Sequence, residues 1–149
     1  MTSALLACGG LFLTAFAAAT LLPAQSELAL AGLLAHGAAP VWALLAVATL
    51  GNTAGSSVNW LLGRGVARFR GRRWFPVSPA ALARAEGWYR RYGRWSLLLS
   101  WAPVVGDPLT LAAGVMREPF PSFVLITLAA KLGRYLAVAA AVLAWTGDA

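Results

Sequence analysis

Four long apolar stretches fill most of the chain and limit what it can fold into. They cover residues 4–22, 38–63, 95–115 and 120–145. The second stretch could rise about 39 Å as a helix, which is enough to cross a bilayer with some tilt. Charged residues make up only 11% of the chain, against about 25% in soluble proteins. The pattern predicts an all-α integral membrane protein with one membrane domain over residues 1–149.

The one long polar segment, residues 64–94, is strongly basic. It holds nine arginines and a single acid, Glu86, which gives +8, whereas the rest of the chain sums to −1. Positive loops remain in the cytoplasm, so we expect this loop to be cytoplasmic and no nucleic-acid partner. Ser78 and Pro79 are typical of a helix start. Apolar side chains then share one face, which predicts an amphipathic helix at about 80–92 on the membrane surface.

The two broken apolar stretches resemble each other. Pro23 lies four residues before Glu27, and Pro103 lies four residues before Asp107, which Pro108 follows. A long apolar segment comes after each unit, which indicates an internal duplication. The predicted units are a first repeat, 1–63 (hairpin about 4–36, helix 38–63), and a second repeat, 95–149 (hairpin about 95–115, helix 120–145).

The basic loop fixes how these repeats relate to the membrane. If each hairpin is re-entrant, entering and leaving on one side, the repeats are inverted and the hairpin tips meet inside the bilayer. Paired broken helices of this kind mark the binding site of many transporters. Residues 4–22 could instead span outright, because 19 helical residues rise about 28 Å. Both alternatives for this segment stay open.

Charged side chains inside apolar segments are the main candidate site residues. A charge at the bilayer centre costs about 2.5–3.5 kcal/mol on insertion scales, so it needs water, a partner or a substrate. Glu27 and Asp107 follow the two breaks, and Lys131 and Arg134 share one face of the last segment. Arginine forks and lysine ammonium groups both bind phosphate. The alternatives to a binding site are structural: the acids could only cap helices, or the charges could form an ion pair that only stabilises the fold.

Small and polar residues form a stripe along the second apolar stretch. Small residues allow transmembrane helices to approach closely, so helix packing is the default interpretation. The polar members could also line a path between the hairpins. The glycines are Gly51, Gly55 and Gly63, and the polar residues are Asn52, Ser56 and Asn59.

At these motifs the sequence resembles the DedA family, also called the SNARE-associated Golgi or VTT-domain family, and its YqaA-like branch. The resemblance extends in order over nearly the whole chain. The matching pieces are ATLLPAQSE (19–27), GNTAGSSVNWLLGR (51–64), RYGR (91–94), LLSWAPVVGD (98–107), LAAG (111–114) and KLGRY (131–135).

The resemblance implies two opposed re-entrant hairpins, a bacterial inner-membrane location and a lipid-handling role. Family members are similar to flippases or scramblases of phospholipids and polyprenyl phosphates, some of them thought to be proton-coupled. Pro23 and Glu27 match the family pattern directly. The chain departs from it at Ser100 and Gly106, where many members have arginine, and at Ser56, where an acid is common. These departures put proton coupling and phosphate recognition by hairpin arginines in doubt.

We therefore expect a flippase or scramblase of phosphate-headgroup lipids. The alternatives are a proton- or ion-coupled transporter of a small solute and a non-transporting membrane scaffold. The expected partners are membrane lipids, with protons and a second copy as further candidates. With one cysteine, Cys8, and one histidine, His36, we expect no metal, no cofactor and no enzymatic activity.

Overall fold

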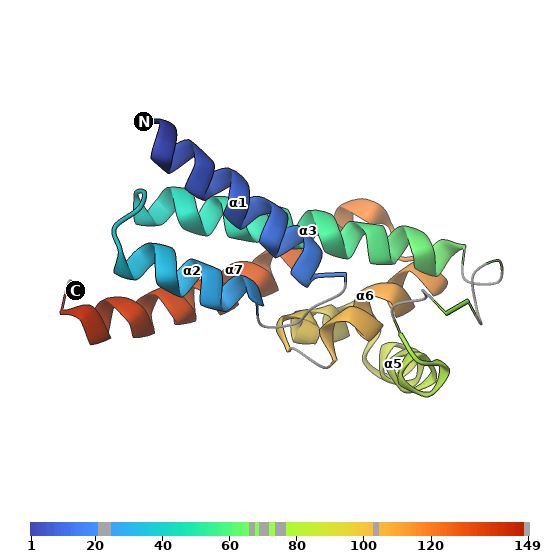
Figure 1. Ribbon diagram of the computed structural model, residues 1–149. Coiled ribbons are helices and arrows are strands. Elements are labelled where there is room, and N and C mark those ends of the chain that lie inside the picture. The colour runs from blue at the N-terminus through green and yellow to red at the C-terminus, as the bar shows by residue number, and fades with distance from the viewer. Residues whose placement is uncertain (21–24, 66–67, 69–71, 74–76, 103–104, 148–149) are drawn as a thin grey trace.

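The computed structural model describes the chain except residues 21–24, 66–67, 69–71, 74–76, 103–104 and 148–149 (Figure 1). The described residues are helical and contain no strand, which confirms the predicted all-α class. The expected breaks at Pro23 and Pro103 lie outside the described residues. The elements are α1 (Thr2–Ala18), α2 (Gln25–Ala35), α3 (Val41–Arg64), α5 (Pro79–Tyr92), the 3-10 helix η1 (Gly93–Trp101), α6 (Gly106–Val115) and α7 (Phe120–Thr146).

Two helices, α3 and α7, are long and apolar enough to cross a membrane. Each begins directly after a proline, Pro40 and Pro119, whose backbone is extended. The helix does not extend to residues before this proline. The predicted helix at 38–63 therefore begins at Val41 and not at residue 38. By contrast, α1 has 17 residues, which is the lower limit of the range of about 17–25 residues for a spanning helix.

Helix α3 is the central element, and it contacts α1, α2, α6 and α7. Helices α1 and α2 run antiparallel on one side of it (Figure 1). Their shared core with α3 and α7 contains Leu11, Leu30, Leu44 and Tyr135, each fully or almost fully buried. The pair η1–α6 packs against α3 and α7 farther along the chain. Two helix pairs thus flank two long helices.

The glycine stripe on α3 lets neighbouring helices approach to backbone contact. A Cβ atom at Gly51 or Gly55 would meet carbonyl groups of α1, and one at Gly63 would meet the Leu111 carbonyl of α6. On α6, Gly114 faces Gly63 across the same contact. The close helix packing predicted for these glycines is confirmed.

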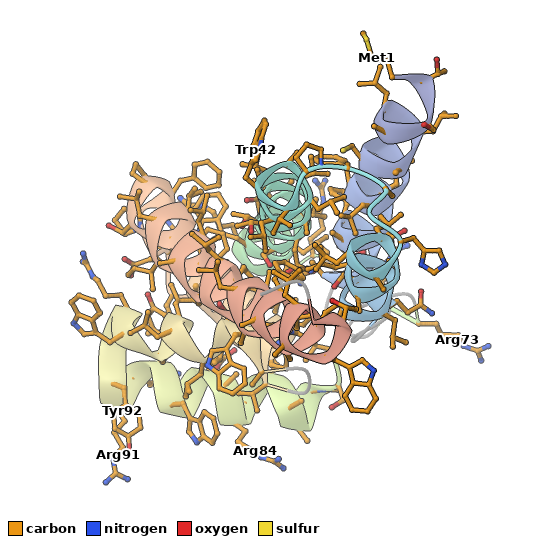
Figure 2. The ribbon with its side chains drawn as sticks, turned by 90° about the vertical axis from the view of Figure 1, so that its left-hand side faces the viewer. Met1, Trp42, Arg73, Arg84, Arg91 and Tyr92 are labelled. Atoms are coloured by element: carbon orange, nitrogen blue, oxygen red, sulfur yellow. The ribbon has the colours of Figure 1, made fainter. Side chains whose placement is uncertain are left out.

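The amphipathic helix predicted at about 80–92 is confirmed as α5, Pro79–Tyr92. The Ser78 side chain accepts a hydrogen bond from the Ala81 backbone N–H at 3.3 Å, which caps the helix start. Leu82 and Ala85 are buried against α6, whereas Arg84 and Arg91 point away from the other helices (Figure 2). The basic face of α5 is therefore turned outward while its apolar face packs on α6.

We predict that Gly63→Ala lowers the free energy of unfolding in detergent by about 1–3 kcal/mol, the usual cost of overpacking a tight contact. Gly133 is the control, because a Cβ atom there meets nothing within 4 Å. Gly133→Ala should be neutral or stabilising by up to about 1 kcal/mol through helix propensity. Thermal unfolding followed by circular dichroism compares the two variants. Equal effects would contradict the proposed contact between α3 and α6.

Candidate functional site

The charged residues of α7 lie at the centre of the molecule. Lys131 is only 2% exposed. The Arg134 guanidinium lies 2.5 Å from the Glu27 carboxylate on α2. Beside this ion pair, the Tyr135 hydroxyl donates to the Ser26 hydroxyl at 2.9 Å. Two adjacent residues of α2 are thus bound by two adjacent residues of α7.

Asp107 on α6 belongs to the same electrostatic group. It interacts with both α7 cations, Lys131 and Arg134, and Lys131 also interacts with Glu27. Within the described part of the chain, however, no carboxylate or hydrogen-bond acceptor pairs directly with the Lys131 ammonium. The structure brings the four charges predicted as site residues into one group, in which only Arg134 and Glu27 are in contact.

Both acids also occupy helix starts. Glu27 lies in the first turn of α2 and Asp107 in the first turn of α6, where the helix dipole favours a negative charge. Pro108 is buried beside Asp107, in a first turn that tolerates proline because its N–H lacks a helical partner. The capping interpretation therefore fits the geometry as well, and the two roles are compatible.

The polar stripe of α3 holds the end of α1. Asn52 donates from its amide to the Ala15 carbonyl at 3.0 Å, and Asn59 donates to the Ala19 carbonyl at 2.8 Å. The last carbonyls of a helix have few partners within it. Asn59 supplies a partner for the Ala19 carbonyl, whereas Asn52 adds a second donor to the Ala15 carbonyl, which also accepts from the Ala19 backbone N–H at 3.3 Å. Ser56, between them, is completely buried. The two asparagines thus have a packing role, whatever else the stripe does.

Several buried polar side-chain atoms around α3 and α7 have no hydrogen-bond partner among the described residues. Buried polar groups are normally hydrogen-bonded, and one without a partner lowers the stability of the fold by about 1–3 kcal/mol. Water molecules or a polar ligand can satisfy groups of this kind. The atoms include Glu27 Oε2, Asn52 Oδ1, Ser56 Oγ, Asn59 Oδ1, Ser100 Oγ and Thr127 Oγ1.

Ser100 and Gly106, which depart from the family pattern, pack directly against each other. The two residues are in backbone contact, and a Cβ atom at Gly106 would collide with the Ser100 carbonyl. An arginine at position 106 therefore does not fit this packing. Positive charge near Asp107 comes from α7 instead.

A further acid, Glu118, is buried, and the sequence analysis missed it. The Tyr89 hydroxyl donates to its carboxylate, Arg94 lies 3.4 Å away, and the Trp60 indole N–H donates to its carbonyl at 3.1 Å. Burial and then the hydrogen bond to Glu118 raise the pKa of Tyr89 above its usual range, so the phenol remains a donor. The cluster joins α5, η1 and α3 to the link between α6 and α7. No sequence pattern marks Glu118, and Ser26 and Tyr135 are signalled only by their charged neighbours.

The described residues contain no group of three His, Cys, Asp or Glu side chains that could hold a metal ion. We call the four charges, together with the amides and hydroxyls around them, the polar centre. This composition suits an ionic or hydrogen-bonding ligand.

Comparison with known proteins identifies the family. Residues 22–143 match the VTT domain. The chain belongs to the VTT-domain family. Its membrane character follows from this membership together with the two long apolar helices.

Two curated relatives align with most of the chain. It is 43% identical over 131 residues to "Inner membrane protein YqaA" of Escherichia coli (strain K12), an alignment that spans 88% of this chain and 87% of the relative. It is 35% identical over 135 residues to an "Uncharacterized protein" of Haemophilus influenzae (strain ATCC 51907 / DSM 11121 / KW20 / Rd), spanning 86% and 82%. No solved structure matches the chain.

We predict that Glu27 and Arg134 are strongly coupled in this VTT-domain protein. A double-mutant cycle with Glu27→Gln and Arg134→Gln should give a coupling energy of about 1–3 kcal/mol, since both side chains are largely buried. The matched control is the i,i+4 pair Glu86–Arg90 at 3.8 Å, whose arginine is 69% exposed. That pair should give less than about 0.5 kcal/mol. Reversible unfolding in mixed micelles measures both, and equal couplings would contradict the buried ion pair.

Proposed function

We propose that the protein moves lipids with phosphate headgroups across the bacterial inner membrane, as a flippase or scramblase. The observation that carries the proposal is the buried Lys131 ammonium. It lies beside an arginine in a membrane helix, and no anion of the described chain contacts it directly. An unpaired cation in an apolar helix is costly and usually marks a substrate or ion path. A phosphate group supplies the missing anion.

The position of the cations supports a site near the middle of the bilayer. Lys131 and Arg134 lie in the middle of the 27-residue helix α7. At 1.5 Å per residue they are about 16 and 21 Å from its start, out of a total rise of about 40 Å. A headgroup bound there is halfway across. The unpartnered hydroxyls and amides around α3 would replace its hydration shell.

The ion pair suggests how a headgroup enters and leaves. An arginine side chain can form a two-pronged contact with phosphate, as arginines do with carboxylates. A phosphate therefore competes with Glu27 for Arg134 while Lys131 contributes a second charge. When the lipid leaves, Glu27 recovers Arg134, so that the empty site is neutralised within the protein. Arg134 thus pairs with the Glu27 carboxylate when the site is empty and with the lipid phosphate when the site is occupied.

For the topology, we propose that the α5 side is cytoplasmic and that α1–α2 and η1–α6 are re-entrant pairs. Helix α1 is too short to cross easily, and α3 ends at Arg64, where the basic segment begins. Positive charge remains on the cytoplasmic side. The two pairs then enter from opposite faces, and each places an acid near α7.

We predict that replacing both α7 cations by glutamine slows anionic lipids selectively. In liposomes containing the reconstituted protein, Lys131→Gln with Arg134→Gln should reduce the movement of labelled phosphatidylglycerol or polyprenyl phosphate at least about tenfold, or about 1.4 kcal/mol. A labelled diacylglycerol, which has no charge, should be affected much less. Lys131→Arg is the control, because it keeps the charge. Equal losses for charged and neutral lipids would favour a scramblase groove without charge recognition.

The topology gives a separate prediction. In a Cys8→Ser background, Ser78→Cys should react with a membrane-impermeant maleimide only after cells are opened. Ala38→Cys, in the link between α2 and α3, should react in intact cells. Labelling of Ser78→Cys from outside would overturn the proposed orientation.

A further inference from the structure

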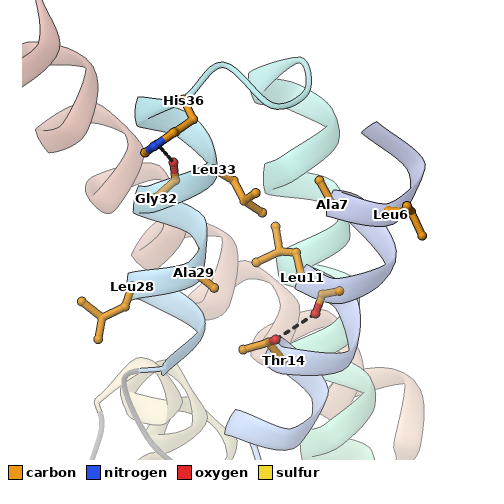
Figure 3. Close-up of a pocket in the computed structure, with 10 residues that line it drawn as sticks. Leu6, Ala7, Leu11, Thr14, Leu28, Ala29, Gly32, Leu33 and His36 are labelled. Atoms are coloured by element: carbon orange, nitrogen blue, oxygen red, sulfur yellow. Dashed lines mark hydrogen bonds between the residues drawn. The ribbon is translucent and has the colours of Figure 1, made fainter. Parts of the chain in front are cut away.

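A groove of about 550 Å³ lies between α1 and α2, outside the polar centre (Figure 3). Its size is within the range of pockets that hold small ligands. Its walls are mainly leucine, alanine and glycine side chains of the two antiparallel helices. Leu6, Leu11, Leu28 and Leu33 are the large apolar residues that line it.

Glycines keep the groove open. Gly10 and Gly32 both line it, and a Cβ atom at either would meet nothing within 4 Å. This distinguishes them from Gly51, Gly55 and Gly63, which lie in tight helix contacts. At Gly10 and Gly32 the lack of a side chain leaves open space, and neither glycine brings two helices into backbone contact.

The groove is polar at one end only. Inside it, the Thr14 hydroxyl is satisfied by the Gly10 carbonyl at 2.8 Å, so the wall offers no free donor. At the other end, His36 Nδ1 lies 2.9 Å from the Gly32 carbonyl. A carbonyl can only accept, so Nδ1 carries the proton and Nε2 remains available to an external group. The groove therefore fits an amphiphile with one polar end.

Its direction matches that of a lipid in the bilayer. The His36 end lies near the start of α3, and α3 runs about 36 Å from there to Arg64. The opposite end reaches Thr14 and Leu28, and Leu28 follows Glu27 of the polar centre. A chain entering at His36 thus points from the surface opposite the basic loop toward the interior of the membrane.

We propose that this groove holds one acyl or prenyl chain of a phosphate-headgroup lipid, with the headgroup at His36 and the chain end near Thr14 and Leu28. The lipid class rests on the proposed function; the occupancy of the groove does not require transport. The groove would be a waiting site for a lipid of the leaflet opposite the basic loop, with its tail beside the polar centre.

Photocrosslinking tests the proposal. The protein is reconstituted in phosphatidylcholine vesicles that contain phosphatidylglycerol with a diazirine on one acyl chain, either at its end or near its carboxyl group. After illumination, the labelled residues are mapped by mass spectrometry. The end label should mark residues near Thr14 and Leu28, and the label near the carboxyl group should mark residues near His36.

Filling the groove provides the matched control. Gly10→Phe and Gly32→Phe should reduce crosslinking in the groove about tenfold, the effect of displacing roughly two methylene groups. Gly9→Phe should leave it unchanged, because Gly9 lies on the same helix, also has open space around it, and does not line the groove. Labelling of lipid-facing Leu125 on α7 reports ordinary bilayer contact in every variant.

Three outcomes would overturn the proposal: groove labelling no stronger than at Leu125, no effect of the filling variants, or a crosslink between two copies at Gly10→Cys in a Cys8→Ser background. The last would show that a second copy covers the groove. A filling variant that loses groove labelling but transports lipid normally supports occupancy of the groove by lipid and leaves the proposed function standing. Loss of transport in Lys131→Gln with groove labelling intact would keep the two sites distinct.

Discussion

The arrangement of the molecule depends on the need to accommodate charge inside an apolar helix. Helix α7 carries Lys131 and Arg134 near its middle, and neither can be left facing hydrocarbon without a large cost. The Arg134–Glu27 ion pair and the Tyr135–Ser26 hydrogen bond meet that need on the α2 side. On the α6 side, Asp107 interacts with both cations at longer range. The charge contact with α7 is thus direct on the α2 side and of longer range on the α6 side.

Helix α3 supplies the framework for this arrangement. Its glycines bring α1 and α6 into backbone contact, and Asn52 and Asn59 bind the carbonyls of Ala15 and Ala19 at the C-terminal end of α1. Short helices that end within an apolar interior need such partners, because their terminal carbonyls cannot reach water. The same packing leaves further buried hydroxyl and amide oxygens of α3, η1 and α7 without a hydrogen-bond partner in the part of the chain that the structure describes. The framework that holds the short helices therefore also leaves polar groups in the interior.

Much of this could be predicted from the sequence, because apolar length, proline and charge act locally. The two long helices, the cap at Ser78, the amphipathic helix α5 and the tight contacts of the α3 glycines follow from such patterns. The pairing of Glu27 with Arg134, in preference to Lys131, could not be predicted, because it depends on how α2 is rotated against α7. The Glu118 cluster also could not be foreseen, since its partners Tyr89, Arg94 and Trp60 come from separate segments. The inverted relation of the repeats and the re-entrant hairpins stay predictions.

The central claim is that the α7 cations bind a phosphate headgroup inside the membrane, and the sequence offers a direct way to observe this. Lys131 is the only lysine in the chain, so lysine labelled with ¹⁵N at Nζ gives a single side-chain signal. Solid-state NMR of the protein in bilayers containing polyprenyl phosphate or phosphatidylglycerol can measure dephasing of that signal by ³¹P. The account predicts dephasing that reports direct contact and disappears when phosphate lipids are replaced by diacylglycerol and a neutral glycolipid. The account would be contradicted if the Lys131 Nζ signal showed no dephasing by ³¹P in bilayers in which the ¹⁵N side-chain signals of the loop arginines did show it.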